Sequence, residues 1–123
     1  MKSVLLVLLL VSELLIAVCS QTFARVGAQV SEEDRGVTDL MIQYGCPACH
    51  TIPQVPGAVG QVGPALAGLG QRSYIAGALP NTPENIVSWI MHPQHFRPGS
   101  AMPEMGVTEQ DAHRIQIFLE SVR

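Results

Sequence analysis

Apolar residues recur at helical spacing in three stretches of the chain. In the first stretch, residues 33–44, the apolar positions lie three or four residues apart and therefore share one helix face. They are Val37, Leu40, Met41 and Tyr44. Gly45 follows directly, and glycine suits the left-handed conformation in which many helices end. The pattern predicts a helix from about residue 33 to residue 44.

The second stretch begins at "NTPEN". Thr82 is a good N-cap residue, Pro83 suits the first helical position, and Glu84 lies near the positive end of the helix dipole. The expected buried face consists of Ile86, Val87, Ile90 and Met91. Because Pro93 cannot continue a helix, we expect this one to end near His92.

The third stretch, "VTEQDAHRIQIFLESVR", carries the clearest pattern. Thr108 is a suitable N-cap, and Asp111 three residues later completes a capping-box pattern. The apolar positions then follow at i, i+3, i+4 and i+7, as in an amphipathic helix. They are Ile115, Phe118, Leu119 and Val122.

The segment between the first two helices has a different character. Residues 51–81 are rich in glycine and proline and hold few charges, which is typical of loops and short turns. No run alternates convincingly as a strand, so the expected fold class is all-α with long ordered loops. The chain of 123 residues is long enough for one domain. Three modest helices give a thin core, which usually requires a disulfide, a metal or a cofactor.

The N-terminus has the layout of a secretory signal peptide. Lys2 precedes an apolar run over residues 4–18, and small and polar residues follow. The run is 15 residues long and contains Ser12 and Glu13, whereas a membrane-spanning helix needs about 20 mostly apolar residues. We therefore expect residues 1–24 to be a cleaved signal peptide and residues 25–123 to be the mature domain. The alternative is a retained membrane anchor over residues 4–18.

The charge of the mature domain excludes one class of function. Residues 25–123 contain six arginines, nine acidic residues and no lysine, a net charge of −3. Nucleic-acid binding requires a basic patch or stripe, and this sequence has none. The same scarcity of cations predicts weak long-range electrostatic steering towards partner proteins.

The most informative motif is "QYGCPACHTIP", residues 43–53. Cys46, Cys49 and His50 form C-x-x-C-H, the attachment signature of c-type haem. Two thiols three residues apart on one turn suit addition to the two vinyl groups of one porphyrin. His50 is then directed at the iron from the proximal side.

Other uses of this motif fit less well. A thioredoxin-like redox pair requires a βαβ context, which the sequence lacks. A structural zinc site requires four ligands at paired spacing, and His92, His95 and His113 do not supply it. A disulfide between Cys46 and Cys49 would leave His50 without a role. We therefore expect one covalently attached haem c.

The second axial ligand of the iron is expected downstream, in a loop that can cover the opposite ring face. "FRPGSAMPEMG" places Met102 in a turn just before the last helix, and His/Met ligation is typical of cytochromes c. The other methionines, Met41, Met91 and Met105, suit packing roles. His92, His95 and His113 are the rival ligands, but their positions favour exposed side chains.

The order of these motifs resembles a class I cytochrome c over nearly all of residues 33–123. The segments that carry the resemblance are "YGCPACHTI", "GQVGPALAGLGQRSY", "TPENIVSWIMHPQHFRPGSAMP" and "TEQDAHRIQIFLESV". The resemblance implies a cytochrome c fold of three to five helices wrapped around one haem. It also implies that the carbonyl of Pro64 accepts a hydrogen bond from His50. Further cofactor-binding residues implied by it are Arg72 and Tyr74 near a haem propionate, Ser100 nearby, and Trp89 against the axial methionine.

The expected function is electron transfer. Because His50 and Met102 fill both axial positions, the iron has no open site for a substrate, so the protein is expected to be a carrier and not an enzyme. We expect an exported, periplasmic protein that carries one electron between respiratory partners such as a dehydrogenase or a terminal oxidase. Three alternatives remain: a haem c subunit of a dehydrogenase or oxidase complex, a membrane-anchored cytochrome c, and a haem peroxidase.

Overall fold

The computed structural model describes residues 32–123, so the predicted signal peptide and the alternative anchor over residues 4–18 lie outside the described residues. Within this part the chain forms four α-helices: α2 (Glu32–Gln43), α3 (Pro83–Met91), α4 (Pro93–Phe96) and α5 (Glu109–Ser121). Two short 3-10 turns, Cys46–Ala48 and Leu69–Gln71, lie between α2 and α3. None of the described helices is long and apolar enough to cross a membrane.

The predicted starts of α3 and α5 are confirmed. The Thr82 hydroxyl accepts a hydrogen bond from the Asn85 N–H at 3.2 Å, and the Thr108 hydroxyl accepts one from the Asp111 N–H at 3.2 Å. Each contact satisfies a backbone donor that the first helical turn leaves without a partner. The capping box predicted at α5 is only half formed, because the Asp111 carboxylate accepts a hydrogen bond from the Tyr44 hydroxyl instead.

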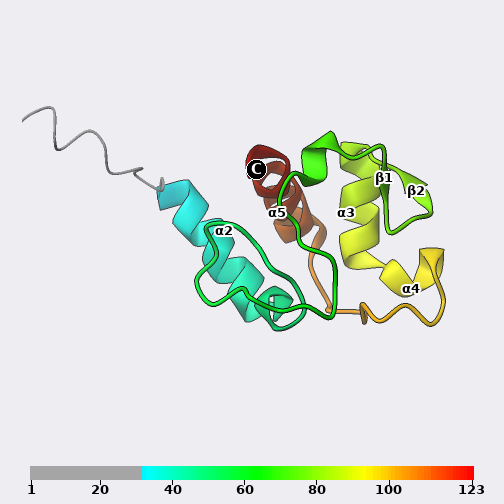
Figure 1. The fold of residues 1–123 in the computed structure, drawn as a ribbon, viewed down its shortest axis with the longest axis horizontal. Helices are drawn as coiled ribbons and strands as arrows, with labels where there is room; N and C mark the ends of the chain where they lie inside the picture. Colours follow the sequence, from blue (N-terminus) through cyan, green and yellow to red (C-terminus); the bar gives the residue numbers. More distant parts are fainter. Residues whose placement is uncertain (1–31) are drawn as a thin grey trace, which may run out of the picture. The chain divides into compact units, whose positions relative to one another are not determined.

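The hydrophobic core lies around α5, which packs against both α2 and α3 (Figure 1). The apolar faces predicted from helical spacing supply most of it. Its most deeply buried members on the helices and at the end of α5 are Met41, Ile86, Ala112, Ile115, Phe118, Leu119 and Val122. Ile52, Val55, Ala58 and Leu69 enter the same core from the long loop region. The loops therefore contribute apolar packing as well as connections.

A small hairpin interrupts the loop region and corrects the expectation that no strand is present. β1 (Tyr74–Ile75) pairs antiparallel with β2 (Leu79–Pro80), with Ile75 opposite Leu79. The turn between them contains Ala76 at φ 50° and Gly77 at φ 67°. Consecutive residues with positive φ are typical of the tight turns that join hairpin strands. Strands of two residues are too short to show an alternating pattern in the sequence.

Candidate cofactor site

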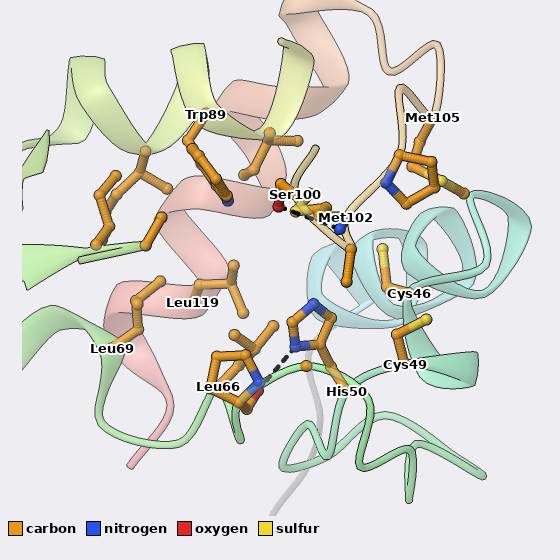
Figure 2. Close-up of a pocket in the computed structure, with 18 of the residues that line it drawn as sticks. Cys46, Cys49, His50, Leu66, Leu69, Trp89, Ser100, Met102, Met105 and Leu119 are labelled. Atoms are coloured by element: carbon orange, nitrogen blue, oxygen red, sulfur yellow. Dashed lines mark hydrogen bonds between the residues drawn. The ribbon is translucent and has the colours of Figure 1, made fainter. Parts of the chain in front are cut away.

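A cavity of about 860 Å³ opens between the helices and the long loops. Its inner wall is apolar and comes from α2, α3 and α5 and the segments between them, with Leu66, Leu69 and Leu119 among the lining residues (Figure 2). The cavity brings together all nine residues proposed from the sequence. They are Cys46, Cys49, His50, Pro64, Arg72, Tyr74, Trp89, Ser100 and Met102.

A tight turn presents the two cysteines and His50 to this cavity. The turn starts at Gly45, whose φ of 77° suits glycine because it carries no Cβ. The backbone N–H groups of Cys49 and His50 both donate to the carbonyl of Cys46, at 3.2 and 3.0 Å. Because the three residues share one hydrogen-bonded turn, their relative positions are fixed by the backbone.

The His50 ring is oriented by a backbone carbonyl. Its Nδ1 lies 2.7 Å from the carbonyl oxygen of Pro64, so Nδ1 carries the proton and donates it. In a neutral ring with this hydrogen bond, Nε2 carries the lone pair, and the ring points across the cavity (Figure 2). A neutral imidazole fixed by a hydrogen bond at its other nitrogen is the usual arrangement of a metal-binding histidine.

Gly63 makes room for this ring. A Cβ built on Gly63 would lie only 2.6 Å from Nδ1 of His50, so no side chain fits at this position. The Gly63 N–H donates to the carbonyl of Cys49 at 2.8 Å, which ties the loop to the cysteine turn. Gly60 is similarly restricted, because its Cβ would lie 2.6 Å from the carbonyl carbon of Cys49.

Cys46 and Cys49 are free thiols on one side of the cavity (Figure 2). Burial raises the pKa of the Cys46 thiol; a hydrogen bond to its own backbone lowers it in part, and the neighbouring Cys49 also raises it. No group of three or more His, Cys, Asp or Glu side chains that could hold a metal ion occurs among residues 32–123. The described residues therefore do not provide the ligand set of a structural zinc site.

Met102 lies across the cavity from His50 (Figure 2). Its backbone N–H donates to the Ser100 hydroxyl at 3.2 Å. In the described part of the chain, no histidine other than His50 lines the cavity. His92 lies 3.6 Å from the carboxylate of Glu104 with its side chain 61% exposed, and His95 and His113 are also exposed.

The polar residues at the cavity rim differ in how they are held. The Arg72 guanidinium donates through Nη2 to the carbonyls of Ala65 and Ala67, at 2.5 and 3.1 Å. Tyr74 is 63% exposed. The Trp89 indole reaches the cavity from α3 with its nitrogen towards the Ser100–Met102 loop (Figure 2).

Three residues at this site were missed from the sequence. Arg97 lines the cavity and donates through Nη1 to the carbonyl of Ala76 at 2.9 Å, which links the Met102 loop to the hairpin. Gly63 was missed because its role depends on contact with His50, although its place in a glycine-rich run next to Pro64 was a usable signal. Gln94 was missed too, and it contacts the Met102 loop directly.

Comparison with known proteins finds a relative of this chain among the respiratory oxidases. Cytochrome c oxidase subunit 2 of Alkalihalophilus pseudofirmus is 33% identical over 105 residues, which are 85% of this chain and 27% of that protein. The chain is distantly homologous to a region of cytochrome c oxidase subunit 2. It therefore spans about a quarter of the length of that oxidase subunit. No protein-family description and no solved structure gives a significant match.

Proposed function

We propose that this chain is a haem c domain of the class I cytochrome c type that transfers electrons in a respiratory chain, in association with a terminal oxidase. The observation that carries the proposal is the convergence of Cys46, Cys49, His50 and Met102 on one apolar cavity. The homology to oxidase subunit 2 favours a haem c subunit of an oxidase complex over an independent carrier.

The residues around the cavity fit a haem. A porphyrin needs a large apolar space for its ring and cations or hydrogen-bond donors for its two propionates. The cavity of about 860 Å³ has a mostly aliphatic wall, and Arg72 and Arg97 both line it. None of the described residues that line it is acidic. An amphiphilic, anionic ring therefore meets no carboxylate in this cavity.

Each group has a distinct role in this proposal. Cys46 and Cys49 would hold the ring through thioether bonds, because both thiols lie on the same side of the cavity. His50 would bind iron through Nε2, since Nδ1 is engaged by Pro64. Met102 would bind from the opposite face through its thioether sulfur. The haem would supply reversible one-electron chemistry, and if His50 and Met102 both held its iron no site would remain for a substrate, so we propose a carrier and not an enzyme.

The rim residues would hold the polar edge of the ring. Arg72 uses only one of its nitrogens on the carbonyls of Ala65 and Ala67, so further N–H donors remain for a propionate. Arg97 would do the same from the Met102 loop, and the exposed Tyr74 hydroxyl would donate to the same carboxylate. Trp89 and Ser100 would lie beside the axial methionine.

The electron donor and acceptor would dock without strong charge attraction. Residues 25–123 hold six arginines, nine acidic residues and no lysine, so the rate of association should depend little on salt. An exported domain at the respiratory membrane is consistent with the apolar N-terminal segment. The domain is either released by removal of residues 1–24 or held at the membrane by an anchor over residues 4–18. The mass of the mature protein distinguishes these two possibilities.

The decisive test is covalent attachment of haem. The full chain is matured in a host with haem-attachment machinery, denatured in acid and weighed. We expect one added haem mass, reduced attachment in Cys46→Ala or Cys49→Ala, and none in the double variant. A chain without added mass would refute the proposal. Oxidised protein should also show a sulfur-to-iron band at the red end of the spectrum that is lost in Met102→Ala.

Association with an oxidase is tested separately. The native protein is extracted from membranes in mild detergent, and its migration with haem–copper oxidase subunits is followed by native electrophoresis and mass spectrometry. Migration with the oxidase supports the subunit assignment. If the haem-loaded protein migrates without the oxidase subunits, the result would instead favour an independent carrier.

A further inference from the structure

The side chain of Gln94 lies inside the loop that carries Met102. Gln94 is the second residue of the short helix α4, and its side chain is half-buried against residues 99–102. Its Nε2 group donates to the carbonyls of Ser100 and Met102, at 2.8 and 2.6 Å. Its Oε1 atom accepts the N–H of Gly99 at 3.0 Å. One side chain thus satisfies three backbone groups of this loop.

Only a carboxamide can make these three contacts. They require one acceptor and two donors on the same end group, which Gln and Asn possess. A glutamate at this position has no donor while it is ionised, and a lysine has no acceptor. The length of the glutamine side chain also matters, because the contacts span residues 99–102 from a helix that ends at Phe96.

The backbone of Gln94 is held by the segment that follows Met102. The Gln94 N–H donates to a carboxylate oxygen of Glu104 at 3.2 Å, and the other oxygen of Glu104 lies 3.6 Å from Nδ1 of His92. The chain therefore leaves α4, passes through the Met102 turn and returns to the start of α4. Gln94 is bound to this loop on both sides of Met102.

We propose that Gln94 is a positioning residue for Met102. By fixing the carbonyls of Ser100 and Met102, its carboxamide holds the methionine backbone so that the side chain stays directed into the cavity. This inference rests on the proposed function, in which Met102 binds the haem iron. Without the carboxamide, two carbonyls and one N–H in the loop lose their partner, and the loop gains conformations in which the sulfur is displaced.

The test compares Gln94→Ala and Gln94→Glu in the full, haem-loaded chain. Gln110→Ala and Gln110→Glu are matched controls, because Gln110 is exposed in the first turn of α5 and does not line the cavity. The oxidised proteins are titrated with imidazole, which replaces a weakly held methionine at the iron. The loss of the sulfur-to-iron band and the apparent imidazole affinity are measured together.

The order of the variants separates hydrogen bonding from packing. Loss of the hydrogen bonds should tighten imidazole binding about tenfold in Gln94→Ala. Gln94→Glu should bind imidazole more tightly still, because its carboxylate would face two carbonyl oxygens and lie near Glu104. Both Gln110 variants should stay within about twofold of the original protein. If side-chain volume alone matters, Gln94→Glu will resemble the original protein and only Gln94→Ala will differ.

A second measurement locates the effect within the loop. Amide exchange at Gly99 should be slow in the original protein, in which Oε1 of Gln94 accepts the Gly99 N–H, and fast in Gln94→Ala, which lacks that acceptor. If Gln94→Ala does not attach haem, the imidazole titration of Gln94→Glu, which keeps the side-chain volume, still tests the inference.

The outcomes distinguish this inference from the proposed function. If the original protein shows the sulfur-to-iron band and both Gln94 variants keep it with unchanged imidazole affinity, the inference is wrong and the proposed function stands. The inference is also wrong if Gln94→Glu resembles the original protein and only Gln94→Ala differs, or if amide exchange at Gly99 stays slow in Gln94→Ala. If the original protein has attached haem but no such band, Met102 is not the ligand and both the ligand assignment and this inference fail.

Discussion

The hydroxyl of Tyr44 donates a 2.7 Å hydrogen bond to the carboxylate of Asp111. The contact joins the end of α2 to the first turn of α5, although the two residues are 67 positions apart in the sequence. Tyr44 also lines the cavity. The hydrogen bond therefore connects the packing of the two helices to the wall of the proposed haem site.

Removing this hydrogen bond should destabilise the protein. A hydrogen bond to a charged group contributes about 1.5–3 kcal/mol; because the Asp111 side chain is 21% exposed, we expect about 1–2 kcal/mol for Tyr44→Phe. Urea unfolding of the haem-loaded protein measures the change. In an Asp111→Ala background the same tyrosine change should cost much less, and an equal cost in both backgrounds would show that the hydrogen bond contributes nothing.

Two glycines should respond in opposite ways to replacement by alanine. Gly63→Ala places a methyl group against the His50 ring, so it should displace the ring and weaken the haem ligand. Gly36 lies within α2, and a Cβ built on it would lie 3.1 Å from Nη2 at the flexible end of the Arg114 side chain, which can move aside. Gly36→Ala should therefore stabilise the helix by about 0.5–1 kcal/mol.

Haem spectra and thermal unfolding of the two glycine variants check this contrast. We expect Gly63→Ala to show altered axial ligation or lowered haem attachment, whereas Gly36→Ala should keep the original spectrum and melt at a higher temperature. A normal spectrum in Gly63→Ala would mean that the loop moves away without disturbing His50.

Local signals in the sequence account for α2, α3 and α5, whereas the short helix α4 was not predicted, because Pro93 was interpreted only as the end of α3. Thr82 and Thr108 cap their helices as predicted, and most of the apolar positions at helical spacing are buried. Tertiary hydrogen bonds have no such signal. The role of Gln94 could not be predicted, because its hydrogen-bond partners are defined only once the chain turns back at residues 99–102. The Asp111 carboxylate accepts a hydrogen bond from the distant Tyr44 hydroxyl and not from the backbone at the start of its own helix. The motif and the expected His/Met ligation predicted four of the nine proposed site residues, and the other five required the family resemblance.

The two cavity arginines should raise the reduction potential. A nearby cation favours the reduced haem, because oxidation adds a positive charge at the iron. A charge about 12 Å away at an effective dielectric constant of about 20 changes the oxidation free energy by roughly 1.4 kcal/mol, or about 60 mV before solvent screening.

We therefore expect Arg72→Leu and Arg97→Leu to lower the potential by about 20–60 mV each, as measured by redox titration. Arg114→Leu is the control, because Arg114 does not line the cavity, and its potential should change less. An equal shift in all three variants would indicate a general effect of net charge and not a specific role at the cavity rim.

Loss of the haem should remove most of the cooperative folding. The described domain surrounds a cavity of about 860 Å³ lined mainly by apolar residues, and filling it with water would expose that surface at a cost of about 25 cal/mol per Å². Three helices of nine to thirteen residues have little other core to maintain their packing.

The Cys46→Ala/Cys49→Ala double variant, produced without haem, provides the test. We expect circular dichroism to show reduced helix content and calorimetry to show a broad or absent transition. Adding free haem should restore part of the helix content, because His50 and Met102 remain available to bind iron. A sharp thermal transition in the haem-free chain would mean that the cavity collapses into a core of its own, and that the cofactor contributes to function but not to folding.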